Sequence, residues 1–308
     1  MYDTVIIGAG PAGLTAGLYA GRYRLKTLML EKIAVGGQIL LSATIENFPG
    51  FPGGVMTADL IERIKEQVDD LGVETRYAEV SGIAVEGATT PQTLTVTTSE
   101  GALQAKSVII AAGAHWKRLK VPGEEKLVGR GVSFCATCDA PLFRNKETVV
   151  VGGGDKAIEE AIFLSKYASR VTVVHRRKGL RATEILQEQA KAEPKISFVL
   201  DSVVEEIIGD GKVEGVSIKD VANGRVRTIP CQGVFVFIGI APSTEFLQGT
   251  VAMDESGFVI TDTKCKTSLP GVFACGDCRE KHLYQVITAC ADGAEAAHAA
   301  HNYLLHHR

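Results

Sequence analysis

The same glycine-rich pattern occurs twice in this sequence, each time after a short apolar run and before a stretch of helical character. The first copy follows residues 4–7 and consists of Gly8, Ala9, Gly10, Pro11, Ala12 and Gly13. The second follows residues 149–151 and consists of Gly152, Gly153, Gly154, Asp155, Lys156 and Ala157. A strand that turns through such glycines into a helix lets a pyrophosphate approach the backbone at the helix N-terminus. Two copies therefore predict two Rossmann-like dinucleotide-binding domains of the α/β class.

The two copies differ at the end of the strand that follows each glycine turn. The strand predicted at 27–30 ends at Glu31, whereas the one at 171–174 ends in a basic group. That group consists of His175, Arg176 and Arg177, with Arg181 predicted one helical turn further on. A carboxylate accepts hydrogen bonds from ribose hydroxyls and repels a 2′-phosphate, while arginines bind that phosphate bidentately. The first copy therefore favours an adenine nucleotide with a free ribose, and the second favours NADP(H).

The order of elements predicts that the second domain is inserted into the first. A buried strand at 107–114 leads into a linker at 115–122, and short strands fill most of 193–240 before a second linker at 241–242. The tail contains a strand, Gly276 and Asp277, which are typical of another nucleotide contact, and then a long helix over 285–305. We therefore expect a first domain made of 1–115 and 245–308, and a second domain over 116–244.

Composition limits the partners and the compartment. The chain has 308 residues, a net charge of −3 and 6% aromatic residues, which gives no reason to expect binding to nucleic acid. No apolar run approaches the length of about 18 residues that spans a membrane. The seven cysteines are an odd number, and no signal peptide is recognisable. We expect a cytoplasmic protein without nucleic-acid or membrane partners.

Cys135 and Cys138 form a C-x-x-C pair, which in a reducing compartment indicates redox chemistry or half of a zinc site. Cys275 and Cys278 form a second such pair, so a four-cysteine zinc site is an alternative. We favour the redox interpretation of the first pair and expect no metal. The second pair is interpreted as buried packing residues, with a redox or sensor role as the alternative. Packing roles are expected for the remaining cysteines, namely Cys231, Cys265 and Cys290.

Nearly the whole chain resembles the low-molecular-weight thioredoxin reductases. The resemblance places a redox disulfide at Cys135 and Cys138, with Cys138 facing the flavin and Cys135 attacking the partner. It assigns FAD to the first glycine motif with Glu31, and also to Gly36, Gly37, Gln38, Asn47, Ala112, Gly113, Gly276, Asp277 and Gln285. It assigns NADPH to Gly152, Gly154, Asp155, Lys156, Ala157, Glu160, His175, Arg176, Arg177 and Arg181. Asp139, which follows Cys138, is a candidate general acid and base for the thiols, with a turn or helix-start carboxylate as the alternative.

The resemblance implies an enzyme that passes electrons from NADPH through FAD and the disulfide to thioredoxin or a similar small protein. It also implies a homodimer and a rotation of the second domain between half-reactions. A flavin reductase with a non-thiol acceptor is the alternative. The sequence departs from the family at Ala140-Pro141, at Tyr284 and at the second cysteine pair, which leaves partner docking open.

Overall fold

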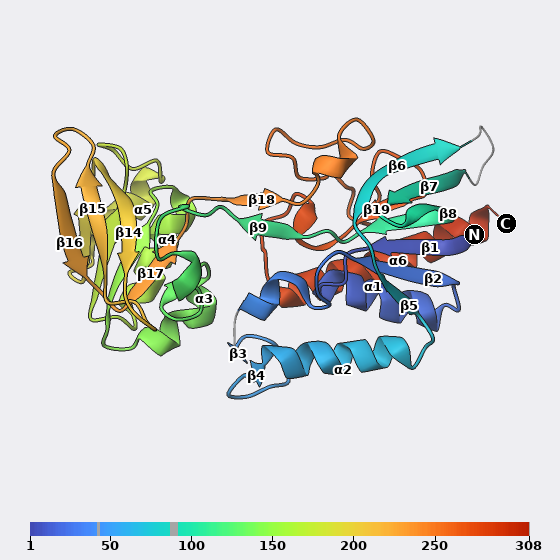
Figure 1. Cartoon of the computed structure of the whole chain (residues 1–308), viewed down its shortest axis with the longest axis horizontal. Helices are drawn as coiled ribbons and strands as arrows, with labels where there is room; N and C mark the ends of the chain where they lie inside the picture. Colours follow the sequence, from blue (N-terminus) through green and yellow to red (C-terminus); the bar gives the residue numbers. More distant parts are fainter. Residues whose placement is uncertain (42–43, 87–91, 308) are drawn as a thin grey trace. The chain divides into compact units, whose positions relative to one another are not determined.

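The structure is a computed structural model that describes residues 1–41, 44–86 and 92–307. The chain divides into two compact units (Figure 1). Unit 1 consists of Met1–His115 and Ala241–Arg308, and unit 2 is Trp116–Ile240. One continuous segment thus forms unit 2, and both ends of the chain belong to unit 1.

Unit 1 is built on a sheet in the order β5-β2-β1-β8-β7-β6, with β19 also paired to β8. Its strands are β1 (Tyr2–Ile7), β2 (Thr27–Glu31), β5 (Glu74–Tyr77), β6 (Val80–Glu86), β7 (Thr93–Thr98), β8 (Gly101–Ile110) and β19 (Val272–Ala274). The strands β5, β2, β1, β8 and β19 are parallel to their neighbours, and β6 and β7 extend the sheet antiparallel. The carboxyl ends of the parallel strands therefore meet at one edge, where a dinucleotide-binding domain places its ligand.

Three helices of unit 1 pack on one face of this sheet: α1 (Pro11–Arg22), α2 (Thr57–Asp69) and α6 (Val286–His306). Ile6 and Met29 point into this helical layer, whereas Val5 and Leu28 pack on the opposite face, as strand alternation requires. Helices α1 and α6 cross closely because their contact residues are small. A Cβ on Gly293 would lie 2.2 Å from the Ala12 carbonyl oxygen.

Unit 2 repeats the plan with a parallel sheet in the order β10-β17-β11-β12-β13. Its strands are β10 (Val132–Ser133), β11 (Glu147–Val151), β12 (Arg170–Val174), β13 (Ile196–Val199) and β17 (Gly233–Val236). Strand β11 lies between β12 and β17, just as β1 lies between β2 and β8. Its helices are α3 (Ala136–Asp139), α4 (Asp155–Ser165) and α5 (Glu184–Ala192). The predicted fold class, two Rossmann-like units, is confirmed.

The strand-rich region predicted over 193–240 contributes strands to two different sheets of unit 2. Strands β14 (Ser202–Ile208), β15 (Gly215–Asp220) and β16 (Val226–Pro230) form a separate antiparallel sheet, while β13 and β17 join the parallel one. The chain passes between the units at the segments that the sequence predicts as linkers. These segments contain β9 (Ala114–Trp116) and β18 (Ile240–Pro242), which pair with each other.

Short elements complete the chain. They are β3 (Thr44–Ile45), β4 (Val55–Met56) and the 3-10 turns η1 (Gly37–Leu41), η2 (Glu125–Leu127), η3 (Ala140–Phe143), η4 (Glu245–Leu247) and η5 (Gly276–Cys278). Within the described residues, no helix combines the length and apolar character needed to cross a membrane.

Candidate active site

The first glycine turn joins β1 to α1 and combines two packed glycines with an open one. Gly8 has a φ of +103°, and a Cβ there would lie 2.3 Å from the Ala111 carbonyl oxygen. A Cβ on Gly13 would lie 1.9 Å from the Gly8 oxygen. Gly10 differs, because the nearest atom to its Cβ position is the Gly36 oxygen at 3.8 Å. Gly10 therefore keeps a surface free at the N-terminus of α1, where backbone N–H groups attract phosphate.

Glu31 ends β2 beside this turn, and its carboxylate is held by the backbone. Oε2 accepts a hydrogen bond from the Ala9 N–H at 2.8 Å, and Oε1 accepts one from the Ile33 N–H at 2.9 Å. A carboxylate oxygen can accept more than one hydrogen bond, so both oxygens keep capacity for ribose hydroxyls. The geometry fits the predicted ribose contact.

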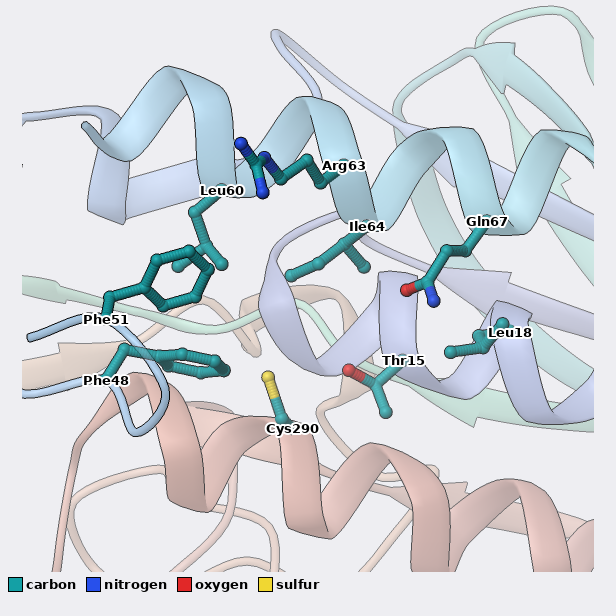
Figure 2. Close-up of a pocket in the computed structure, with 9 residues that line it drawn as sticks. All are labelled: Thr15, Leu18, Phe48, Phe51, Leu60, Arg63, Ile64, Gln67 and Cys290. Carbon is teal, nitrogen blue, oxygen red and sulfur yellow. The ribbon is translucent and has the colours of Figure 1, made fainter. Parts of the chain in front are cut away.

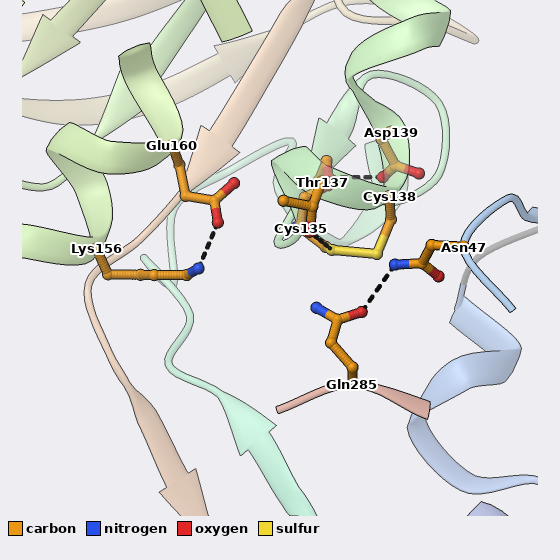
Figure 3. The surroundings of a disulfide bond; sticks show 9 residues. Asn47, Cys135, Thr137, Cys138, Asp139, Lys156, Glu160 and Gln285 are labelled. Atoms are coloured by element: carbon orange, nitrogen blue, oxygen red, sulfur yellow. Dashed lines mark hydrogen bonds and ion pairs between the residues drawn. A yellow bond between two sulfur atoms is a disulfide. The ribbon is translucent and has the colours of Figure 1, made fainter. Parts of the chain in front are cut away.

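The other predicted flavin-site residues of unit 1 lie on loops and helix ends. The Gly36 N–H donates to the Ala9 oxygen at 2.8 Å, which fixes the loop before η1 against the glycine turn. Gly37 and Gln38 follow in η1 and are exposed. Asn47 Nδ2 donates to Gln285 Oε1 at 2.9 Å (Figure 3), and Gln285 caps the N-terminus of α6.

The loop after β8 carries the next predicted pair, Ala112 and Gly113. The Gly113 oxygen accepts a hydrogen bond from the Ser243 N–H at 3.0 Å, and Gly113 itself has a φ of +70°. No atom lies within 4 Å of the position that its Cβ would take. The loop is thus fixed on one side and open at Gly113.

Asp277 lies in η5, directly after β19, within a group of charged residues that we did not predict. Lys281 Nζ is 2.9 Å from Asp277 Oδ1 as an ion pair, although that buried oxygen receives no hydrogen bond of good geometry. Burial raises the pKa of the Asp277 carboxyl, and the charge of Lys281 opposes the rise. Arg279 and Asp292 complete the group. Three of its members are separated in sequence from the glycine motifs, so no motif indicated them.

The second cysteine pair is buried. Cys275 and Cys278 are free thiols with 0% exposure, and Cys278 Sγ donates to the Cys275 oxygen at 3.2 Å and to the Ile110 oxygen at 3.6 Å. Burial raises the pKa of Cys278 to about 11 and that of Cys275 well above its usual value. These thiols stay protonated and act as packing residues, because the thiolate is the reactive form.

The four-cysteine zinc alternative finds no support. Cys135 and Cys138 are joined to each other by a disulfide. In the parts of the chain that the structure describes, no group of three or more His, Cys, Asp or Glu side chains could hold a metal ion. Cys231 and Cys265 are buried as expected, but both lie in loops rather than in strands or helices.

The second glycine turn, between β11 and α4, repeats the first. A Cβ on Gly152 would lie 2.5 Å from the Phe237 oxygen. The position on Gly154 is open, with Arg181 Nη2 as its nearest neighbour at 3.9 Å. A Cβ on Gly153 would lie 2.3 Å from His175 Nδ1, so the imidazole ring packs directly beneath the turn.

The basic group at the end of β12 is fixed by the glycine turn and not by a helix. Residues 176–182 contain bends and no helix, and α5 begins only at Glu184, so the predicted helical turn before Arg181 is wrong. The Arg181 N–H instead donates to the Gly153 oxygen at 2.6 Å. This bond brings the Arg181 guanidinium to the open side of Gly154. Arg176 and Arg177 are exposed next to it in sequence.

His175 is 5% exposed, and none of the described residues forms a hydrogen bond with its Nε2. Its pKa is lowered, first by burial and then by the charges of Arg181, Arg177 and Arg176, against a smaller opposing effect of the Gly179 backbone. A neutral imidazole therefore lies beneath the glycine turn, close enough to the charges of the three arginines for them to lower its pKa.

The first turn of α4 holds the remaining residues predicted for NADPH. Asp155 Oδ1 accepts the Thr183 N–H at 2.7 Å and so links α4 to the segment before α5. Lys156 Nζ pairs with Glu160 Oε1 at 2.5 Å (Figure 3). The Glu160 side chain is 4% exposed, and its Oε2 is buried without a hydrogen-bond partner. Ala157 packs its methyl group against Gly152.

Cys135 and Cys138 form a disulfide with a Cα–Cα distance of 5.3 Å (Figure 3). Cys135 is the N-cap of α3, and both cysteines are half-buried. Asp139, the last residue of α3, accepts a hydrogen bond from Ser133 Oγ at 2.6 Å. Ser133 Oγ also accepts the Cys135 N–H at 3.1 Å. Ser133, which the sequence did not indicate, therefore joins the carboxylate to the backbone of the disulfide.

A pocket of about 440 Å³ lies in unit 1 among α1, α2, α6 and the loop at 48–51 (Figure 2). Its lining residues are Thr15, Leu18, Phe48, Phe51, Leu60, Arg63, Ile64, Gln67 and Cys290. Cys290 points from α6 into this space, and burial raises the pKa of its thiol. The sequence predicted only packing for this residue.

A family model described as pyridine nucleotide-disulphide oxidoreductase matches residues 2–301, and the chain belongs to that family. The two-unit fold, the paired glycine turns and the C-x-x-C disulfide all agree with this membership.

Within the family, the chain is of the low-molecular-weight thioredoxin reductase type, whose members are FAD-binding, NADPH-dependent enzymes. It is 43% identical to the thioredoxin reductase of Listeria monocytogenes, over 99% of this chain and 94% of that protein. It is 44% identical to the thioredoxin reductase of Peptoclostridium acidaminophilum, over 99% and 97%. The crystal structure of thioredoxin reductase from Streptococcus pyogenes has 45% identity, a TM-score of 0.92 and 99% coverage of both chains. The predicted family is confirmed.

Proposed function

We propose that the chain reduces thioredoxin or a similar small dithiol protein at the expense of NADPH. The Cys135–Cys138 disulfide carries this conclusion, because it is half-buried, opens a short helix and is linked to a carboxylate through Ser133. A purely structural disulfide needs no such polar support. The relatives named thioredoxin reductase support the same substrate class.

We assign FAD to unit 1. The open side of Gly10 fits a pyrophosphate, and the anchored carboxylate of Glu31 fits an adenosine ribose. The buried Oδ1 of Asp277 is ion-paired with Lys281 but accepts no hydrogen bond of good geometry from the residues that the structure describes, and it fits a ribityl hydroxyl. When bound, FAD supplies a two-electron carrier that accepts hydride from NADPH and can reduce a disulfide. The other residues that we assign to this site are Gly36, Gly37, Gln38, Asn47, Ala112, Gly113 and Gln285.

We assign NADPH to unit 2. The open side of Gly154 fits the pyrophosphate, and Arg181, with Arg176 and Arg177, supplies guanidinium groups for the 2′-phosphate. Preference for NADPH over NADH follows, because NADH lacks that phosphate and leaves the three cations unneutralised.

The thiol step needs only the residues around α3. In the reduced enzyme, the Cys135 thiolate attacks a sulfur of the partner disulfide; a Cys135–partner bond forms and the partner's second sulfur leaves as a thiolate. Cys138 then attacks Cys135 Sγ, which restores the Cys135–Cys138 disulfide and releases the second partner thiolate. The partner gains two electrons and, after protonation, two protons. Asp139, held by Ser133, takes the proton of the attacking Cys138 and returns it to a leaving thiolate.

We also propose that the partner is thioredoxin, that the protein is a homodimer and that it is located in the cytoplasm. Thioredoxin is the substrate named by the relatives, and the homodimer and the cytoplasm follow from the family resemblance and from the cysteine content. Sedimentation of the purified protein tests the homodimer, for which we expect twice the mass of one chain.

An anaerobic titration tests the function. Purified holoenzyme is mixed with NADPH or NADH, then with oxidised thioredoxin, while flavin absorbance and new thiols are followed. We expect flavin bleaching by NADPH, weaker bleaching by NADH, and thiol formation that the C138S variant abolishes. Unchanged thioredoxin reduction by C138S, or purified protein without flavin, would contradict the proposal.

A further inference from the structure

Lys281 places a buried ammonium group between two carboxylates. Its side chain is 9% exposed, and Nζ lies 2.9 Å from Asp277 Oδ1 and 3.4 Å from Asp292 Oδ2. A buried charge is tolerated only when it is paired, and removal of one partner leaves the others uncompensated. The ammonium group of Lys281 therefore depends on both carboxylates for charge compensation.

Asp292, on α6, fixes the same turn from a second side. Its Oδ2 accepts the Gly276 N–H at 3.1 Å, and its Oδ1 accepts Arg279 Nη1 at 3.0 Å. Arg279 Nε in turn donates to Thr261 Oγ1 at 2.8 Å. The backbone of η5 is thus held through Asp292, while the adjacent carboxylate is held through Lys281. We call Asp277, Arg279, Lys281 and Asp292 the η5 charge cluster.

The charges of this cluster balance only as a set of four. Two carboxylates face two cations, and the two carboxylates repel each other where they share Lys281. Without Lys281, the Asp277 carboxylate, whose side chain is 36% exposed but whose Oδ1 is buried, would lose its cation in a site to which FAD adds the negative charges of its pyrophosphate. Arg279 is bound to Asp292 and Thr261, and among the ion pairs of the described residues none joins it to Asp277 to replace the missing charge.

We propose that Lys281, anchored by Asp292, is a positioning residue that fixes the Asp277 carboxylate for FAD. This inference rests on the proposed function, which assigns Asp277 to the flavin site. The pair at 2.9 Å is not a good hydrogen bond, so Lys281 orients the carboxylate by charge and leaves its Oδ1 free to accept a ligand hydroxyl.

FAD binding to the apoprotein tests the proposal. FAD is titrated by quenching of its fluorescence at about pH 6 and about pH 8, because burial raises the pKa of the Asp277 carboxyl and loss of the Lys281 charge raises that pKa further. In Lys281→Met we expect the FAD dissociation constant at the higher pH to rise by at least about tenfold, as for a broken buried pair. The loss should shrink at the lower pH, where Asp277 takes up a proton. Lys281→Arg should recover most of the affinity.

Two controls separate charge from packing. Lys65→Met removes an exposed ion pair with Asp69 on α2 of the same unit and should leave FAD affinity unchanged at both pH values. The double variant Asp277→Asn/Lys281→Met lacks the uncompensated carboxylate, so its FAD affinity should no longer depend on pH over this range. The melting temperature of each apoprotein shows whether it is folded. If Lys281→Met does not fold, the double variant and Lys281→Arg carry the same comparison.

The outcomes distinguish this inference from the FAD assignment. Wild-type affinity in Lys281→Met, or an equal loss at both pH values, would overturn the role of Lys281. If Asp277→Asn binds FAD as tightly as the wild type, the assignment of Asp277 itself is wrong. If Asp277→Asn weakens FAD binding while Lys281→Met does not, the assignment stands and only the inference fails.

Discussion

At the scale of single residues, the chemistry depends on side chains that hold other side chains. Ser133 takes part in no predicted motif, yet its hydroxyl bonds both Asp139 and the Cys135 backbone. His175 is predicted to be an NADPH-binding residue, and its ring is buried beneath Gly153. In both cases a neighbour of the reacting or binding group controls its position.

Ser133→Ala should slow thiol exchange while leaving the disulfide able to form. The variant removes the hydrogen bond to the Asp139 carboxylate, and a bond to a charged group lost in this way corresponds to about a tenfold slower step. Stopped-flow reduction of thioredoxin by the pre-reduced variant measures it. Thr137→Val, which removes another hydroxyl near Cys135 Sγ, is the matched control and should change the rate by less. Equal rates for Ser133→Ala and the wild type would show that the Ser133 hydroxyl does not support thiol exchange.

His175 should make unit 2 less stable in mild acid. Its pKa is lowered in the folded protein, so the unfolded chain binds the proton first as pH falls below about 6.5, and the free energy of unfolding decreases there. His175→Gln should lose this dependence, because glutamine does not titrate. Melting temperatures from about pH 7.5 to about pH 5.5 give the comparison. A wild-type curve parallel to that of the variant would show that the imidazole does not resist protonation.

At the scale of elements, the two glycine turns have the same strand–turn–helix arrangement. In each, a Cβ on the first glycine, Gly8 or Gly152, would collide with the carbonyl oxygen directly after a neighbouring strand, whereas Gly10 and Gly154 face open space. The third position is Gly13 in one turn and Ala157 in the other. The glycines at the packed positions are required for close packing of the fold. The open positions, Gly10 and Gly154, leave room for a ligand.

Gly10→Ala and Gly154→Ala should therefore separate stability from binding. Neither added Cβ would meet an atom closer than 3.8 Å, so we expect folded proteins with nearly unchanged melting temperatures. The methyl group would occupy space for a pyrophosphate, so Gly10→Ala should lose FAD affinity and Gly154→Ala should lose NADPH affinity, each by about tenfold or more. Calorimetric titration measures both. Gly13→Ala is the contrast: its Cβ would lie 1.9 Å from a carbonyl oxygen, and it should fail to fold stably.

The sequence predicted these elements well where short-range pattern determines them. The strand–glycine–helix order fixed β1 with α1 and β11 with α4, because apolar runs and glycine turns act locally. The helical turn predicted before Arg181 does not form, because consecutive like charges and Gly179 do not favour a helix. The η5 charge cluster could not be predicted, because Asp292 reaches η5 only after α6 has packed against α1.

At the scale of the whole molecule, the functional parts are divided between the units. The disulfide and the second glycine turn belong to unit 2, while the first glycine turn and Asp277 belong to unit 1. Disulfide and nicotinamide both need near-contact, of about 3–3.5 Å, with one flavin ring. They cannot fill that space together, so rotation of unit 2 between half-reactions remains a prediction.

An engineered cross-link between the units should stop turnover. With rotation blocked, the holoenzyme should still complete whichever half-reaction its locked arrangement allows, but not both. Single-turnover flavin reduction by NADPH and single-turnover thioredoxin reduction are measured separately, before and after chemical cleavage of the link. Full steady-state activity in the locked protein would show that no rotation is needed.

The insertion of unit 2 also sets an order of assembly during synthesis. Unit 2 is complete once residue 240 has left the ribosome, whereas unit 1 still lacks β19 and α6. Helix α1, made first, buries its small residues against α6, which is made last. Because domains generally fold as they emerge, the later segment should fold before the earlier one. The nucleotide site of unit 1 can therefore form only after β19 and α6 have been synthesised. Until then, a nascent chain should be exposed to chaperones and proteases mainly through its unfolded unit 1 segments.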